Sequence, residues 1–166
     1  MEAVKKDTGK PRLGINYFRG WAILYDVLDK VKLDKLEPTS VVWSNLRFNG
    51  LKALAEGNNQ TLVVTLVQIA SIVIDDNTIS AEKIVSAICA KGAEKYSLFN
   101  YRNGFKWSRL WDSLNRHLTS YLEYDKSIDE EFGVEHRMLV VSNCLMLLEH
   151  IVDNLGENDL KEEATQ

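Results

Sequence analysis

Apolar side chains recur at intervals of three and four residues along most of the chain. This spacing places them on one face of an α-helix, so the pattern predicts helices rather than strands. The predicted helices span residues 18–30, 40–56, 60–74, 81–96, 107–124 and 134–155. Residues 1–14, which carry charges, two glycines and a proline, instead predict an extended arm.

For two of these segments, the spacing of apolar residues alone does not decide the structure or its place in the fold. Residues 60–74 (QTLVVTLVQIASIVI) are rich in β-branched side chains, which favour strands, but they contain no turn signal, which favours one buried helix. We predict a helix. Residues 134–155 are apolar almost all round, which is typical of the central helix of a bundle or of a helix at a subunit interface. The sequence therefore predicts an all-α bundle of about six helices.

A length of 166 residues fits one domain, which we place at residues 1–155, followed by an acidic, frayed tail at 156–166. A net charge of −4 excludes a broad nucleic-acid-binding surface. Cys89 and Cys144 lie in apolar runs without CxxC spacing, so we expect buried free thiols rather than a zinc site. Neither a signal peptide nor a membrane span is visible, and we expect a cytoplasmic protein with no nucleic-acid or membrane partner.

The first candidate chemistry lies in the segment 107–124. Arg109, Asp112, Arg116 and Glu123 share one face of this predicted helix. One interpretation is a solvent-exposed face with an Asp112–Arg116 ion pair. The other is a phosphate-binding face, since the guanidinium group of arginine can donate two parallel hydrogen bonds to phosphate oxygens.

The second lies in the segment 125–136 (DKSIDEEFGVEH), which gathers acidic residues at the start of the last helix. Acidic groups are favoured at a helix N-terminus, but converging carboxylates also hold Mg²⁺ or Mn²⁺. Along the same helix His136, Asn143 and His150 recur every seven residues, as a polar line that either hydrogen-bonds across the bundle or serves a site. For His150 we favour the structural interpretation.

Seven short motifs, taken in order, resemble the phage dATP/dGTP diphosphohydrolase family, which is itself similar to MazG-type all-α nucleoside triphosphate pyrophosphohydrolases. The motifs are D-T-G-K-P-R-L (7–13), G-A-E-K-Y (92–96), N-Y-R-N-G (100–104), W-S-R-L (107–110), R-H-L (116–118), D-E-E-F-G (129–133), and His136 with Asn143 seven residues later. The resemblance covers residues 5–28 loosely and 91–150 closely, and it is carried by the order and spacing of the motifs.

The resemblance implies hydrolysis of dATP or dGTP to the monophosphate and pyrophosphate with Mg²⁺, or with Mn²⁺ or Co²⁺ as alternatives. It implies that Asp129 and Glu131 bind the metal and that they act in catalysis together with His136. The residues implied to bind substrate are Lys10, Lys95, Tyr96, Asn100, Arg109, Arg116 and Asn143. It further implies a phage-encoded homo-oligomer, a dimer or tetramer, in the host cytoplasm.

Two features keep other functions open. Residues 32–80, which we predict as an inserted helical pair, separate the first helix from the later motifs. Leu139 stands where the family commonly carries a histidine, three residues after the one that matches His136. A protein that binds a nucleotide without cleaving it, and a helical phage protein that binds a host partner through residues 32–80, are therefore the alternatives.

Overall fold

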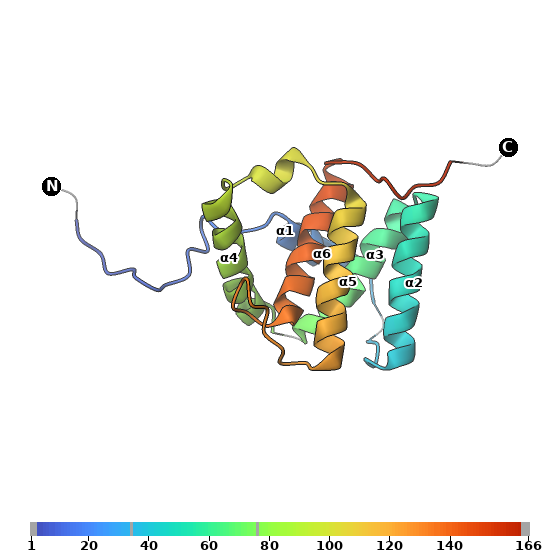
Figure 1. Cartoon of the computed structure of the whole chain (residues 1–166), viewed down its shortest axis with the longest axis horizontal. Helices are drawn as coiled ribbons and strands as arrows, with labels where there is room; N and C mark the ends of the chain where they lie inside the picture. The colour runs from blue at the N-terminus through green and yellow to red at the C-terminus, as the bar shows by residue number, and fades with distance from the viewer. Residues whose placement is uncertain (1–2, 34, 76, 164–166) are drawn as a thin grey trace.

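The computed structural model describes residues 3–33, 35–75 and 77–163, and within these ranges the chain forms six α-helices, one short 3₁₀ helix and no strand (Figure 1). The elements are α1 (Gly20–Lys30), α2 (Ser40–Glu56), α3 (Asn59–Ile74), α4 (Thr78–Lys95), η1 (Asn100–Asn103), α5 (Trp107–Glu123) and α6 (His136–Val152). The prediction of an all-α bundle of about six helices is confirmed, including a helix rather than a strand for α3. The 3₁₀ helix η1 lies between the segments predicted as helices at 81–96 and 107–124.

Local capping sets most of the helix ends. Thr39 Oγ1 accepts a hydrogen bond from the amide of Val42 and so caps α2, whose C-terminus ends at Gly57 with a φ of 66°. The fourth helix begins at Thr78, three residues before the start predicted at residue 81. Asn77 caps α4 by accepting from the amide of Ser80, so the helix begins two residues before that serine.

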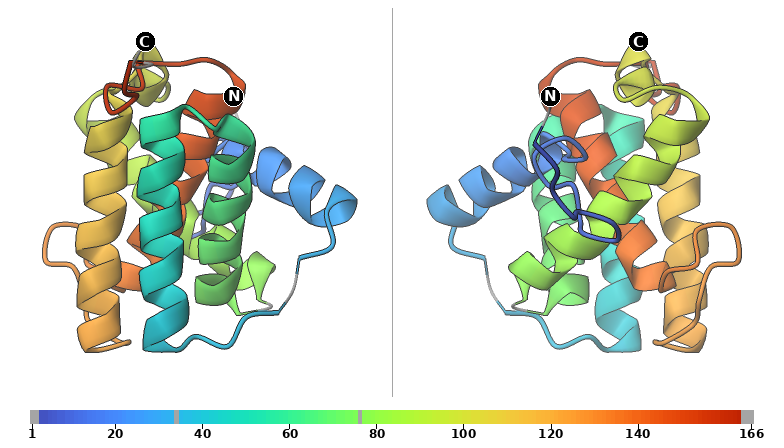
Figure 2. Two further views of the ribbon diagram at one scale, coloured as in Figure 1. Left: turned by 90° about the vertical axis from the view of Figure 1, so that its right-hand side faces the viewer. Right: turned by 90° about the vertical axis from the view of Figure 1, so that its left-hand side faces the viewer.

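The core is built around α6, whose residues from Met138 to Leu145 are all buried. α5 and α3 pack on it most extensively, α1 and α4 cover further sides, and α2 lies outside α3 and beside α5 (Figure 2). α3 is a core helix, with Leu62, Leu66 and Ile69 fully buried. The predicted inserted pair at 32–80 therefore corresponds to one outer helix, α2, and one inner helix, α3.

A buried ion network fixes α1 and η1 against the end of α6. Glu149 is fully buried and accepts hydrogen bonds from the Gly20 amide at 3.1 Å, from the Tyr101 hydroxyl at 2.9 Å and from Arg102. Burial raises the pKa of the Glu149 carboxyl, while these donors act in the opposite direction. The carboxylate thus satisfies the first amide of α1, which has no side-chain cap of its own.

The acidic tail is docked rather than frayed up to Glu163, which corrects our expectation. The carbonyl of Glu157 accepts from the Trp107 amide at 2.9 Å, and Asp159 accepts from the Ser108 amide at 3.0 Å. Asp159 thereby supplies the N-terminal cap that α5 lacks locally. The last residues, 164–166, lie outside the described part of the chain.

In the described ranges, no single helix is both long and apolar enough to span a membrane. α3 and α4 meet that length and hydropathy only as a pair, and the two are bent by 102° with respect to each other.

Candidate metal centre between α5 and α6

The connection between α5 and α6 is a compact loop. We call its residues 125–135 the acidic loop. Three backbone hydrogen bonds of 2.8–2.9 Å shape it. The amide of Asp129 donates to the carbonyl of Val134, and the amide of Gly133 donates to the carbonyl of Asp129. The amide of His136 donates to the carbonyl of Ser127. Gly133 has a φ of 67°, a left-handed conformation that glycine adopts without strain. The loop therefore has a defined shape and holds its carboxylates in place.

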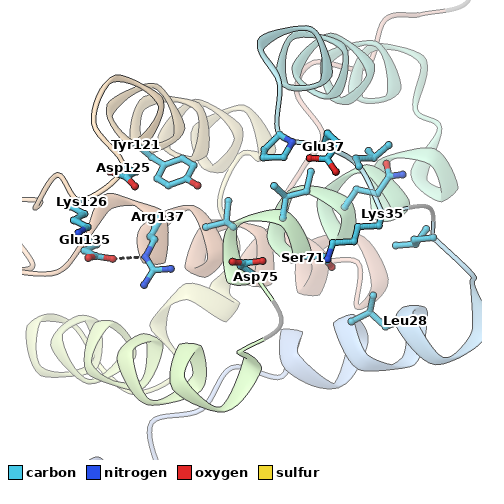
Figure 3. A pocket seen from close by; sticks show the side chains of 16 residues that line it. Leu28, Lys35, Glu37, Ser71, Asp75, Tyr121, Asp125, Lys126, Glu135 and Arg137 are labelled. Atoms are coloured by element: carbon cyan, nitrogen blue, oxygen red, sulfur yellow. Dashed lines mark hydrogen bonds and ion pairs between the residues drawn. The ribbon is translucent and has the colours of Figure 1, made fainter.

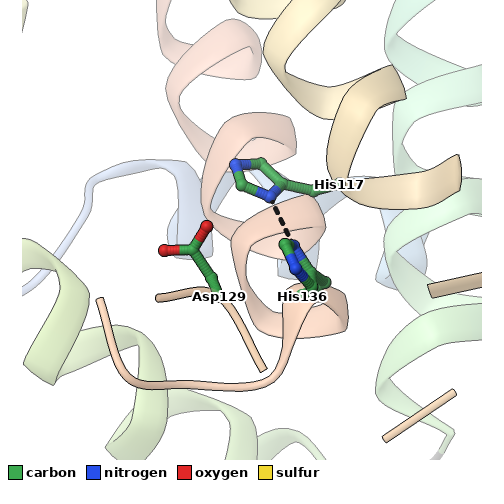
Figure 4. Close-up of side chains that lie close together, drawn as sticks. All are labelled: His117, Asp129 and His136. Carbon is green, nitrogen blue, oxygen red and sulfur yellow. Dashed lines mark hydrogen bonds between the residues drawn. The ribbon is translucent and has the colours of Figure 1, made fainter. Parts of the chain in front are cut away.

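Three side chains converge where this loop meets the two helices (Figure 4). His117 projects from α5, His136 begins α6, and Asp129 comes from the loop. Their potential ligand atoms all lie within 4.8 Å of one another, and all three residues are half-buried. Asp129 is oriented by a 2.8 Å hydrogen bond from the Phe132 amide to one of its carboxylate oxygens, Oδ2.

The two histidines face each other directly. Their Nδ1 atoms are 2.8 Å apart, so one imidazole donates a hydrogen bond and the other accepts it. Burial lowers the pKa of the His117 imidazole. The charges of His136 and Arg116 also lower it, whereas the charges of Asp129 and Glu131 act to raise it. A lowered pKa keeps His117 neutral near pH 7, which is the form that binds metals.

The donor set fits a divalent cation. Two imidazole nitrogens and one carboxylate oxygen, all within 4.8 Å of one another, are donors that could hold such an ion together. Imidazole nitrogens combined with one carboxylate suit first-row transition ions better than Mg²⁺, which prefers oxygen ligands alone. The residues of the cluster thus fit a divalent metal ion, and which metal binds stays a prediction.

Cationic side chains border the cluster. Lys91 donates to the backbone carbonyl of Glu131, and Lys95 Nζ lies 3.9 Å from the Glu131 carboxylate. With Tyr96 and Phe132 these residues line an open cavity of about 470 Å³ at the end of α4. An anionic ligand in this cavity would meet two lysines beside the His–Asp cluster.

A family model described as dATP/dGTP diphosphohydrolase, N-terminal, matches residues 65–160. This match spans more than half of the chain. The chain belongs to this family. No curated protein and no solved structure matches it. The matched range begins inside α3 and includes α4, α5, α6 and the acidic loop, so the whole His117–Asp129–His136 cluster lies within the diphosphohydrolase domain.

The structure brings several of the residues singled out from sequence together. Asp129 and His136 are in the cluster, and the carboxylate of Glu131 faces Lys95 at the cavity edge rather than the histidines. Tyr96 lies beside Lys95, whose ammonium group is 5.2 Å from the centre of its ring. Their assigned roles in metal and substrate binding stay predictions.

The arginine face is divided along α5. Arg116 adjoins His117 and lines a shallow groove of about 570 Å³ with Asp112 and Arg47 of α2. Arg109 is two turns earlier, about 12 Å along the axis from His117 at 1.5 Å per residue, and stacks over the Phe105 ring. Only Arg116 is within electrostatic range of the cluster in the described structure.

Three further residues lie away from the cluster. Asn143 is 5% exposed and donates to the carbonyl of Leu139 in its own helix. Asn100 begins η1, and Lys10 lies in the exposed N-terminal arm. The structural interpretation of His150 is confirmed, because its Nδ1 bonds the Met146 carbonyl and its Nε2 accepts from the Phe105 amide.

The residue that sequence analysis missed is His117. It stands in the R-H-L motif, of which only Arg116 was assigned a role. The available signal was its position between Leu114 and Leu118, on the edge of the buried stripe, where an unpaired imidazole is costly.

A larger cavity than the one beside Lys91 and Lys95 lies elsewhere. It measures about 760 Å³ and lies between residues 33 and 35–38, α3, Tyr121 and Arg137, and no residue of the cluster lines it (Figure 3). Leu28 and Ile72 make part of its wall apolar, while Arg137 is paired with Glu135 at one end. This mixture of apolar and oppositely charged groups does not form a phosphate site.

Proposed function

We propose that the protein hydrolyses dATP or dGTP to the deoxynucleoside monophosphate and pyrophosphate with a divalent metal ion. The observation that carries this proposal is the His117–Asp129–His136 cluster, which lies inside the family domain and beside Lys91 and Lys95. The substrate, together with two free buried cysteines, agrees with a protein of the cytoplasm.

His117 Nδ1, His136 Nδ1 and a carboxylate oxygen of Asp129 would hold the metal. When bound there, a divalent ion supplies Lewis-acid neutralisation of the triphosphate and lowers the pKa of a coordinated water. The Phe132 amide keeps the Asp129 carboxylate in one orientation, so this ligand needs no reorganisation when the substrate binds.

The residues around the cluster would handle charge and protons. Lys95 and Arg116 bind phosphate oxygens, and Lys95 stabilises the negative charge that develops on the departing pyrophosphate. A water oxygen would attack the α-phosphorus and the bond to the oxygen that bridges the α- and β-phosphates would break, while the Glu131 carboxylate would accept the proton of the water. The side chain of Glu131 is largely exposed, and its carboxylate lies 3.9 Å from Lys95 Nζ.

The direct test incubates the protein with each of the four deoxynucleoside triphosphates and Mg²⁺, Mn²⁺ or Co²⁺, and measures monophosphate and pyrophosphate by ion-exchange chromatography. We expect turnover of dATP or dGTP that is fastest with Mn²⁺ or Co²⁺. His117→Ala, His136→Ala and Asp129→Asn should each reduce kcat at least about 100-fold, which is the usual effect of losing a metal ligand or its support.

Glu130→Gln is the matched control, because Glu130 is an exposed neighbour of Asp129 outside the cluster. It should retain turnover within about two-fold. No turnover of any triphosphate with any metal would reject the proposal. If dATP then still raised the unfolding temperature, the protein would be a nucleotide binder, an alternative that the buried Leu139 beside the cluster favours.

A further inference from the structure

The N-terminal arm, residues 3–14, has almost no contact with the body of its own chain. Every residue from Ala3 to Arg12 is exposed, and Val4 is 93% exposed. A Cβ built at Gly9 or Gly14 would meet nothing within 4 Å. Lys10 forms an ion pair only with Asp7 of the same arm, at 3.7 Å, among the described residues.

The direction of the arm is nevertheless fixed at its base. The amides of Ile15 and Asn16 both donate to the carbonyl of Arg12, at 3.0 and 2.8 Å, and Asn16 is buried. Tyr17 then bonds Glu82 of α4 through its hydroxyl at 2.8 Å. The arm consequently leaves the molecule beside α4 and extends away from the bundle (Figure 1).

The arm and the acidic loop carry opposite charges. The arm has four basic side chains, at positions 5, 6, 10 and 12, and one acidic side chain, Asp7, in a chain whose net charge is −4. The acidic loop has five carboxylates and one lysine. Such complementary charges favour association of one surface with the other.

The candidate site also needs more positive charge than its own chain provides. A triphosphate is strongly anionic, and the two lysines at the cavity, Lys91 and Lys95, are both engaged with Glu131. Lysine and arginine side chains bind phosphate oxygens well, and the arm presents Lys10 and Arg12 to the solvent.

Building on the proposed function, we propose that the arm of one copy lies over the acidic loop of a second copy, where its Lys10 and Arg12 bind the triphosphate. In a two-fold symmetric dimer the arm of each copy lies over the acidic loop of the other copy, so the same exchange completes both sites. The arm, exposed in a single chain, then gains a binding surface.

A cross-linking experiment tests the exchange without relying on activity. Lys10→Cys is combined with Glu130→Cys in one chain and treated with a short bismaleimide, since the native Cys89 and Cys144 are buried. We expect covalent dimers on a denaturing gel. The control pairs Lys10→Cys with Lys52→Cys, an exposed position on α2, and should give few. Three results would each overturn the exchange. They are a cross-link within one monomer, no cross-link at all, and a protein that sediments as a monomer and binds a DNA duplex through the arm.

A second experiment asks whether the exchanged arm serves the site. The variant Lys10→Ala/Arg12→Ala should raise the KM for dATP at least about ten-fold, and His136→Ala should be inactive. A heterodimer of the two, purified through two different tags, contains one intact site. At a dATP concentration well below the raised KM it should recover about half of the wild-type turnover. The substitution His117→Ala replaces His136→Ala if the latter does not fold.

The outcomes separate the two proposals. A heterodimer without recovered turnover, beside an active wild-type protein, would overturn completion by the partner's arm and leave the proposed function standing. Covalent dimers of a protein that hydrolyses no triphosphate would instead reject the proposed function and support the exchange of arms.

Discussion

At the scale of single residues, the three histidines show how neighbouring groups decide what an imidazole can do. His117 and His136 are half-buried and share one hydrogen bond beside a carboxylate, so both can exchange that bond for a metal ion. His150 is fully buried, and both of its nitrogens are occupied by backbone groups. It therefore has only a structural role, as its position on the last helix had suggested.

His150 makes a prediction about stability and pH. Burial lowers its pKa below 6.5, with the charge of Arg102 acting in the same direction. The folded chain therefore binds a proton less readily than the unfolded chain does, so stability is full above about pH 6.5 and falls as the pH decreases towards the folded pKa. The slope is at most about 1.4 kcal/mol per pH unit for this one group.

Urea unfolding between pH 5 and 7.5 checks this prediction. His117, whose pKa is also lowered, contributes in the same direction, so the informative comparison is wild type against His150→Gln. The variant should be less stable at pH 7.5 and should lose less stability on acidification. An unchanged pH profile in His150→Gln would show that this imidazole is not held neutral by the fold.

Among the site residues, those with a recognisable motif could be predicted from sequence and those defined by tertiary contact could not. Asp129 and His136 stand within twelve residues of each other near one helix start, so their proximity follows from the chain itself. His117 joins them only because α5 packs on α6. Asn143 lies outside the cluster, because its position on α6 directs its side chain into the core of the bundle.

At the scale of helices, the contact between α2 and α5 explains a glycine that seemed unfavourable. Gly50 lies in the middle of α2, where glycine weakens a helix by about 1 kcal/mol relative to alanine. A Cβ at this position would overlap the ring of Trp111, which is 5% exposed. The glycine therefore permits a close approach that the helical propensity alone would disfavour.

Gly50→Ala should for this reason destabilise the protein, although alanine is the better helix former. We expect a net loss of about 2 kcal/mol, since overpacking a core usually costs about 1–3 kcal/mol. Gly92→Ala in α4 is the matched control, because a Cβ there meets nothing within 4 Å, and it should be neutral or stabilising. Equal unfolding temperatures for the two variants would mean that α2 does not pack on Trp111 in this way.

The helices themselves were largely predictable because their apolar spacing is strong, including α3 despite its β-branched composition. Their ends were less predictable, because caps depend on side-chain geometry. Asn77 caps α4, so this helix begins at Thr78 rather than at residue 81. The docking of the tail could not be foreseen either. It depends on Asp159 meeting the free amide of Ser108, and these two residues are far apart in the sequence.

At the scale of the whole molecule, the candidate metal centre lies where two adjacent core helices are joined. α5, the acidic loop and α6 form one continuous stretch, residues 107–152, inside the matched family domain. α3 supports α6 from another side, and Glu149 with Arg102 fixes α1 and η1 at the opposite end of α6 from His136. The bundle thus positions the cluster, while the cations proposed to bind substrate lie on exposed surfaces around it.

The central claim is that His117, Asp129 and His136 bind one divalent cation that the reaction needs. Titration with Co²⁺, followed by its visible absorption and by the turnover of dATP in the same samples, tests this most directly. The account predicts one Co²⁺ per chain in the wild type and in Glu130→Gln, with turnover rising in step with occupancy. It predicts loss of both signals in His117→Ala and His136→Ala. Unchanged Co²⁺ binding and turnover in these two folded variants would contradict it.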